Sequence, residues 1–241
     1  MIARLIPLFC SLLVALSATA VEPIESLVGE AYGLDSDELL YKEFHTFTYK
    51  DGRIATSTVE YKRPDGTLFA TKTLDFRPHL TVPAFRTEMY GGAWIEALEH
   101  LGDDRIKLIR RQGEGEPLQE KILALKDAMA ADAGFNTFVQ AHFSELMAGE
   151  RLKFQFVAPN RLEAVKFKGE RIEDSRIGDT PLVNFKVSIS SFLSFLVDPL
   201  LLSYDQKTKY LIEYKGLSNI RDEKGELYKT RIRYPELLRG S

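Results

Sequence analysis

The sequence predicts a mainly β protein of the α+β class, in which a long antiparallel meander forms a strongly curved sheet or part of a barrel. Asp51-Gly52 and Asp65-Gly66 separate runs rich in Thr, Val, Phe and Tyr, and Asp-Gly between such runs is a strong β-hairpin signal. The runs are also longer than ordinary strands. Between Gln119 and Gly149 the apolar spacing changes to a helical period, so helices are expected beside the sheet.

The first three strands are predicted from the spacing of the two Asp-Gly turns. They cover Leu39–Lys50, Arg53–Pro64 and Thr67–Pro78. Each turn is expected to be type I′, with positive φ at both central residues. Strands of about 12 residues would be roughly 40 Å long, against the usual five or six residues. In the third strand one face carries Leu68, Ala70, Leu74 and Phe76.

The remaining elements follow from changes of period along the chain. Further strands are expected at Phe85–Tyr90, Trp94–Leu101 and Arg105–Arg111, joined through Gly91-Gly92 and Gly102-Asp103-Asp104. A helix is predicted over Gln119–Ala131, where Ile122, Leu125 and Met129 have helical spacing, with Gly134 as its stop. A second helix, ending near Gly149, has one apolar face made of Phe135, Phe138, Val139, His142, Phe143 and Leu146.

Strands are predicted to return in the last third of the chain. Arg151–Ala158 is expected to pair with Leu162–Lys168 across Pro159-Asn160. Val183–Val197 fits both periods, so we expect a strand that becomes a short helix around Ser190 and ends at Asp198-Pro199. The chain closes with Tyr210–Leu217, a turn at Asp222–Gly225, and Leu227–Tyr234.

The first twenty residues have the pattern of a cleaved secretory signal. Arg4 precedes the apolar run Leu5–Ala15, and Ala18-Thr19-Ala20 fits a cleavage site. We therefore expect residues 1–20 to be a signal peptide, with cleavage after Ala20, and residues 21–241 to form a single periplasmic domain. The apolar run is shorter than the roughly 20 residues that a membrane span needs.

Composition excludes several classes of chemistry. Cys10, the one cysteine, lies in the signal, so no thiolate nucleophile or cysteine metal site is expected in the mature chain. Without Arg4 the mature chain has 31 basic and 35 acidic residues, a net charge of −4, which gives no electrostatic reason to bind nucleic acid. No mature segment is long and apolar enough to span a bilayer.

Catalytic and cofactor motifs are not found in the sequence. None of the four histidines, His45, His79, His100 and His142, has the spacing of a metal site. No G-x-S-x-G elbow marks a hydrolase. Gly113-Glu114-Gly115-Glu116 lacks the spacing of a phosphate loop, and its two carboxylates would repel an anion. We expect neither a metal nor another cofactor.

Aromatic side chains supply the one positive functional indication. A curved sheet covered by apolar helices can enclose a cavity for a hydrophobic ligand. The candidate lining residues are Phe135, Phe138, Phe143, Phe192, Phe195 and Leu196. The alternative is that these side chains fill the core between helices and sheet.

The layout resembles the bacterial lipoprotein-carrier superfamily, which includes LolA-like carriers and LppX-like lipid binders. The likeness covers most of the mature chain and is more specific at Asp198-Pro199, Tyr204-Asp205 and the segment from Tyr214 to Asp222 followed by Gly225, which resemble uncharacterised periplasmic proteins of Gram-negative bacteria. It implies an unclosed antiparallel half-barrel covered by two or three helices, with an apolar cavity between them. No position here matches a cavity arginine or hook-like C-terminal loop of the lipoprotein carriers.

The first functional hypothesis is a non-enzymatic periplasmic carrier or binding protein for a lipid, an acyl chain or another hydrophobic molecule. The alternative is an envelope scaffold with a packed core and a protein partner, which would dock through a sheet edge or a helix face. A hydrolase acting on lipid or glycan is the third hypothesis, and it would need polar residues that converge in the cavity.

Overall fold

The computed structural model describes residues 23–190 and 198–239, and this part of the chain is mainly β, with three short α-helices. The predicted signal lies outside the described residues. The strands are β1 (Ser26–Gly33), β2 (Leu39–Lys50), β3 (Arg53–Lys62), β4 (Leu68–Asp75), β5 (Ala84–Met89), β6 (Trp94–Gly102), β7 (Arg105–Gln112), β8 (Gln119–Ala124), β9 (Met129–Ala131), β10 (Leu152–Ala158), β11 (Glu163–Ile177), β12 (Thr180–Ile189), β13 (Leu200–Asp205), β14 (Leu211–Arg221) and β15 (Leu227–Arg233). The helices are α1 (Gly134–Ala141), α2 (Phe143–Met147) and α3 (Pro235–Arg239).

All fifteen strands belong to one open sheet, in which neighbours in space are almost always neighbours in sequence. The order is β8-β7-β6-β5-β4-β3-β2-β1-β15-β14-β13-β12-β11-β10-β9. Every pair is antiparallel except β9 with β10. The exception to sequence order is β1, which pairs with β2 on one side and with the last strand, β15, on the other. The sheet edges are β8 and β9.

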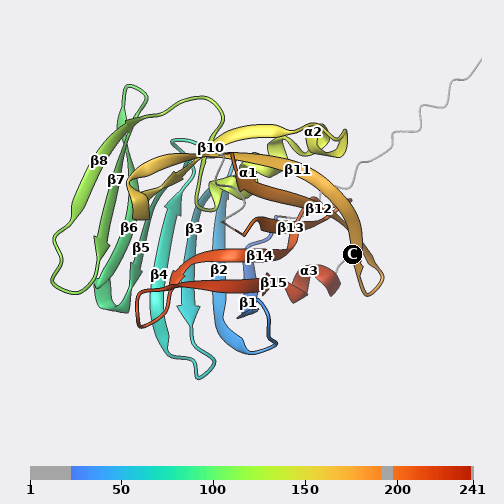
Figure 1. Cartoon of the computed structure of the whole chain (residues 1–241), viewed down its shortest axis with the longest axis horizontal. Helices are drawn as coiled ribbons and strands as arrows, with labels where there is room; N and C mark the ends of the chain where they lie inside the picture. Colours follow the sequence, from blue (N-terminus) through green and yellow to red (C-terminus); the bar gives the residue numbers. More distant parts are fainter. Residues whose placement is uncertain (1–22, 191–197, 240–241) are drawn as a thin grey trace, which may run out of the picture.

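The sheet folds back over a shared hydrophobic core. In Figure 1, β14 and β15 cross in front of β3 and β4, so strands from the two ends of the chain form two crossing layers. Tyr41, Met89 and Leu98 of the first layer are buried with Ile220 and Ile232 of the second. A second core lies between α1, α2 and strands β10, β12 and β13. The small helix α3 packs on β1 and β14.

The predicted meander is confirmed from β2 to β7, although β4 ends at Asp75, three residues before the predicted end at Pro78. Asp51 and Gly52 both have positive φ, 52° and 73°, as a type I′ turn requires. The type I′ expectation is wrong at Asp65-Gly66, where only Gly66 has positive φ (88°). There the loop is one residue longer: the Gly66 N–H donates to the Arg63 carbonyl and the Arg63 N–H donates to the Thr67 carbonyl, which is a type I turn with a glycine bulge.

The helix predicted over Gln119–Ala131 is wrong. Residues 119–124 instead form β8, which pairs with the edge of β7, and Met129 begins β9 beside β10. The three residues at helical spacing do not share a buried face, because Ile122 is 55% exposed while Met129 is buried. Hydrogen bonding to an open strand edge, which is a long-range interaction, outweighed the local apolar spacing.

The second predicted helix is broken into α1 and α2 at His142, whose φ of −104° and ψ of 20° are not helical. Gly134 begins α1 and is not the end of an earlier helix. The predicted pairing of β10 with β11 and the strand character of β12 are confirmed. Strands β1 and β13 and helix α3 were not predicted. The short helix expected after Ser190 falls on residues 191–197, outside the described residues.

Gly134 allows a close approach between α1 and the loop before β5. A Cβ atom at this position would fall inside the van der Waals radii of the Thr81 carbonyl oxygen and the Pro83 Cδ atom. In the same region the Ala131 N–H donates to Thr81 O (2.9 Å) and the Thr81 hydroxyl donates to Met129 O (2.7 Å).

We predict that Gly134→Ala lowers the free energy of unfolding by about 1–3 kcal/mol, the usual cost of overpacking, although helix propensity alone would favour alanine by about 1 kcal/mol. The measurement is chemical denaturation followed by the fluorescence of Trp94, the single tryptophan. Gly169→Ala is the matched control, because its added Cβ meets only a Val187 methyl at 3.9 Å. Equal stability of the two variants would contradict the prediction.

Candidate functional site

Three of the predicted ligand residues come together in one aromatic cluster, which we define as Phe135, Phe138, Phe143, Phe154, Phe156, Phe167, Phe185 and Tyr204. Phe138 of α1 is buried and lies 5.0 Å, ring centre to ring centre, from Phe154 of β10. Phe143 of α2 is also buried and contacts Phe185 edge to face at 5.4 Å. Offset and edge-to-face ring pairs of this kind stabilise beyond the area they bury.

Phe135 lies at the margin of the aromatic cluster and is only partly buried, as are Phe156 and Phe167. Its ring is 5.4 Å from Phe154 and 6.0 Å from Phe156. The other predicted ligand residues, Phe192, Phe195 and Leu196, lie outside the described residues. The assignment of all six residues to a ligand site therefore stays a prediction.

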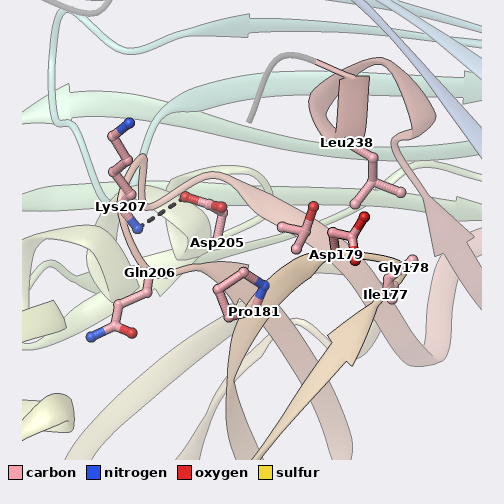
Figure 2. Close-up of a pocket in the computed structure, with 9 residues that line it drawn as sticks. Ile177, Gly178, Asp179, Pro181, Asp205, Gln206, Lys207 and Leu238 are labelled. Atoms are coloured by element: carbon pink, nitrogen blue, oxygen red, sulfur yellow. Dashed lines mark hydrogen bonds between the residues drawn. The ribbon is translucent and has the colours of Figure 1, made fainter.

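An open groove of about 850 Å³ lies at one end of β12 and β13. Figure 2 shows its walls, which come from the β11–β12 hairpin, the turn after β13 and helix α3. The lining residues are Ile177, Gly178, Asp179, Thr180, Pro181, Asp205, Gln206, Lys207 and Leu238. Along β12 and β13 the groove lies one residue pair beyond the aromatic cluster, since Tyr204 pairs with Val183 and the next pair is Asp205 with Leu182. No residue of the aromatic cluster lines the groove.

The polar groups of the groove are of two kinds. The buried carboxylate of Asp205 accepts hydrogen bonds from the Lys207 N–H (2.9 Å), the Thr208 N–H (2.6 Å) and the Thr208 hydroxyl (2.9 Å), so it holds the turn after β13. Asp179, Gln206 and Lys207 are exposed at the rim. The groove therefore combines apolar side chains (Ile177, Pro181 and Leu238) with charged and polar groups at its mouth.

A cluster of buried charges links the two layers of the sheet. The Lys72 ammonium of β4 lies 2.6 Å from Asp132 Oδ2, and both side chains are more than nine-tenths buried. Asn219 of β14 donates to the same oxygen at 2.8 Å. Asp132 itself precedes α1, so three distant parts of the chain meet at one carboxylate.

Glu96 and Arg221 extend this cluster. The Arg221 guanidinium lies 3.4 Å from Glu96 Oε1 and stacks over Trp94 at 4.9 Å from its ring. Lys72 and Glu96 belong to one cross-strand row, with the buried Thr87 between them. Burial raises the pKa of the Glu96 carboxyl above its usual value, and the charges of Arg221 and Lys72 oppose this effect.

A second group of buried polar side chains lies farther along the same core. The Tyr41 and Ser218 hydroxyls are 2.8 Å apart. Glu43 Oε2 lies 3.1 Å from His45 Nε2 and accepts a bond from the Tyr234 hydroxyl at 3.4 Å. Burial, with a contribution from the Glu43 charge, raises the pKa of the Tyr41 and Tyr234 phenols. These contacts join β2 to β14 and to the end of β15.

The other histidines have structural partners, and His142 Nδ1 lies 3.3 Å from Glu145 Oε1. His79 and His100 stack at 6.4 Å, His79 Nδ1 accepts the Val82 N–H, and His100 Nε2 lies 2.7 Å from Val82 O. Burial lowers the pKa of His79. Within residues 23–190 and 198–239, no group of three or more His, Cys, Asp or Glu side chains is arranged to hold a metal ion.

The buried charges are the feature that sequence reasoning missed. One signal was present: Lys72 falls between Ala70 and Leu74 on the apolar face predicted for its strand. A lysine at such a position needs a buried partner. The identity of the partners could not be read from local spacing, because Asp132 and Asn219 are distant in sequence.

In comparisons with known proteins, no family model, no curated protein and no solved structure matches this chain. Among the described helices, none has the length and apolar character needed to cross a membrane.

We predict that Lys72→Met lowers the free energy of unfolding by about 3–5 kcal/mol, because it leaves a buried carboxylate without its cation. Denaturant unfolding followed by Trp94 fluorescence measures the effect. Lys62→Met is the control: Lys62 pairs with Glu60 at 2.7 Å in a solvent-accessible pair, which should contribute less than about 1 kcal/mol. If Lys72→Met lowers the free energy of unfolding no more than Lys62→Met does, the buried Lys72–Asp132 pair does not hold the two layers together.

Glu96 gives a prediction for pH dependence. Because its folded-state pKa is raised, the folded state holds the proton more tightly than the unfolded state, and this contribution to stability is lost as pH rises above the usual value of 4.5. Glu96→Gln should therefore gain stability relative to the unmodified protein as pH rises above about 4.5, the usual value of the carboxyl. Denaturation curves at a series of pH values measure the difference, and a constant difference would show that Glu96 does not titrate abnormally.

Proposed function

We propose that this protein is a non-enzymatic, periplasmic binding or carrier protein for a hydrophobic ligand such as a lipid or acyl chain. The observation that carries the proposal is the groove of about 850 Å³ at the end of the aromatic cluster. This volume is within the roughly 300–1,000 Å³ range of small-molecule sites. The periplasmic location rests on the signal pattern of residues 1–20.

The groove offers different surfaces to the two ends of an amphiphile. Ile177, Pro181 and Leu238 give an apolar wall, while the exposed Asp179, Gln206 and Lys207 supply polar groups at the rim. Burial of an acyl chain contributes about 0.8 kcal/mol per methylene, so a few methylenes against this wall supply measurable affinity before ordering costs.

The arrangement of the C-terminal strands supports the same proposal. We interpret β10–β15 as a half-barrel wall and α1 with α2 as its covering helices. Under this interpretation the partly buried Phe135, Phe156 and Phe167 form an apolar margin that a ligand chain can contact. The likeness to lipoprotein-carrier proteins belongs to this proposal as well, since those proteins hold lipids between a curved sheet and helices.

The exposed edge of β8 favours a second candidate function, an envelope interaction protein. Strand β8 pairs on one side only, and Leu118 and Ile122 are 45% and 55% exposed. An unpaired edge with exposed apolar side chains can accept a strand from a partner protein. Under this alternative the interior serves only as a packed core.

Native mass spectrometry of protein purified without detergent, with lipid analysis of a solvent extract, separates the two candidates. The carrier proposal expects a stoichiometric apolar adduct that a refolded control lacks. A clean apo mass, with no uptake when lipids are added, would favour the interaction protein and rule against the carrier.

We predict that Leu238→Glu weakens palmitate binding at least roughly tenfold. The substitution removes an apolar contact and adds a carboxylate that the bound ligand would have to separate from water, which costs free energy. Displacement of a fluorescent fatty-acid analogue measures the affinity. Leu68→Glu is the matched control, since Leu68 is an exposed leucine (49%) on β4 that does not line the groove. Equal affinity of the two folded variants would remove the groove from the proposal.

A further inference from the structure

Four lysines lie on one face of neighbouring strands: Lys153 on β10, Lys166 and Lys168 on β11, and Lys186 on β12. The strand register places Lys153 opposite Lys168 and Gln155 opposite Lys166. It also places Lys168 opposite Ser188 and Glu170 opposite Lys186. Because side chains alternate along a strand, this lysine face points away from the aromatic cluster, whose Phe154, Phe167 and Phe185 occupy the other face.

The charges of the lysine face are not neutralised by their surroundings. Lys153, Lys166, Lys168 and Lys186 form no ion pair with any carboxylate of the described residues, whereas most other basic side chains on neighbouring strands do. The nearby carboxylate of Glu170 is 2.9 Å from Arg151. The chain has a formal net charge of −3, so this local excess of positive charge is opposite in sign to the whole molecule.

The arrangement also opposes folding. Like charges directly opposite each other on antiparallel strands are destabilising, and Lys153 opposite Lys168 is such a pair. No ion pair within the described residues compensates for it. An anionic partner in contact with this face would supply the missing compensation.

Apolar side chains continue the lysine face toward the centre of the sheet. Leu201 of β13 lies opposite Lys186 and, on its other side, opposite Lys215 of β14. Leu217, two residues beyond Lys215, is 46% exposed. The face therefore combines lysines with the partly buried Leu201 and with Leu217, which is open to solvent.

From this combination we propose that the lysine face docks the protein on a bilayer that carries anionic phospholipid headgroups. Lysine is attracted to such a surface within about one Debye length, so a local patch acts despite the opposite net charge. The exposed leucine can contact the boundary between headgroups and acyl chains. A nucleic acid would instead favour aromatic side chains for base stacking, and the lysine face has none.

The test is co-sedimentation with vesicles of phosphatidylglycerol and phosphatidylcholine, compared with vesicles of phosphatidylcholine alone. The protein should bind the anionic vesicles and lose this binding as salt is raised from roughly 50 to roughly 500 mM. Replacing Lys153, Lys166, Lys168 and Lys186 together by Gln should weaken binding more than roughly a hundredfold, since each lysine contributes about fivefold. The variant should stay folded, because it removes a repulsive pair.

The control variant replaces four exposed lysines elsewhere, Lys50, Lys121, Lys126 and Lys224, by Gln and so has the same net charge. It should bind anionic vesicles within about threefold of the unmodified protein. Equal loss in both variants, or no binding to anionic vesicles, would overturn the proposal. Equal affinity for polyglutamate would overturn it in favour of an acidic protein partner. Leu238→Glu changes the groove and not the lysine face, so it should leave vesicle binding intact. Failure of the carrier proposal can therefore be distinguished from failure of the membrane-docking proposal.

Discussion

The buried contact between Lys72 and Asp132 is the constraint on which the two-layered arrangement depends. Lys72 comes from the first layer, Asp132 from the segment before α1, and Asn219 of the second layer completes the group. Desolvated charges are costly unless they are paired, so the layers are most stable at the separation that satisfies all three groups. The neighbouring contacts of Trp94 with Arg221 and of Tyr90 with the Arg221 carbonyl follow from the same approach.

Because these contacts hold the two layers together, the space between the layers is not available for binding a ligand. Between the layers the space is occupied by buried side chains such as Tyr41, Met89 and Ile220 and by the polar groups that join them. The two proposed surfaces lie elsewhere: the groove at the end of β12 and β13, and the lysines on the face of β10–β12 opposite the aromatic cluster. A ligand bound in the groove would therefore leave the interlayer contacts undisturbed, and so would a membrane in contact with the lysine face.

Local signals were enough to predict the strands from β2 to β7, because every pair except β4 and β5 is joined by a short turn whose residues define it. They failed for β8, where pairing to a free edge outweighed the helical spacing of Ile122, Leu125 and Met129, and for β1, whose second partner is the distant β15. The buried positions of Phe138 and Phe143 followed from helical period alone. The Asp132 partner of Lys72 could not be predicted, because it depends on how the sheet folds back, and neither the groove nor the lysine face has a contiguous motif.

The pairing of β1 with β15 has a consequence for how the chain folds. Glu30 lies opposite Arg233, so the second neighbour of β1 is about 200 residues away in sequence. Contacts that join such distant residues slow folding, since the loop entropy must be lost before the contact forms. Until β15 pairs with it, β1 is hydrogen-bonded to β2 alone and its other edge is unpaired. The pairing of β1 with β15 therefore adds one contact of very long sequence separation to a sheet otherwise made of strands that are neighbours in sequence.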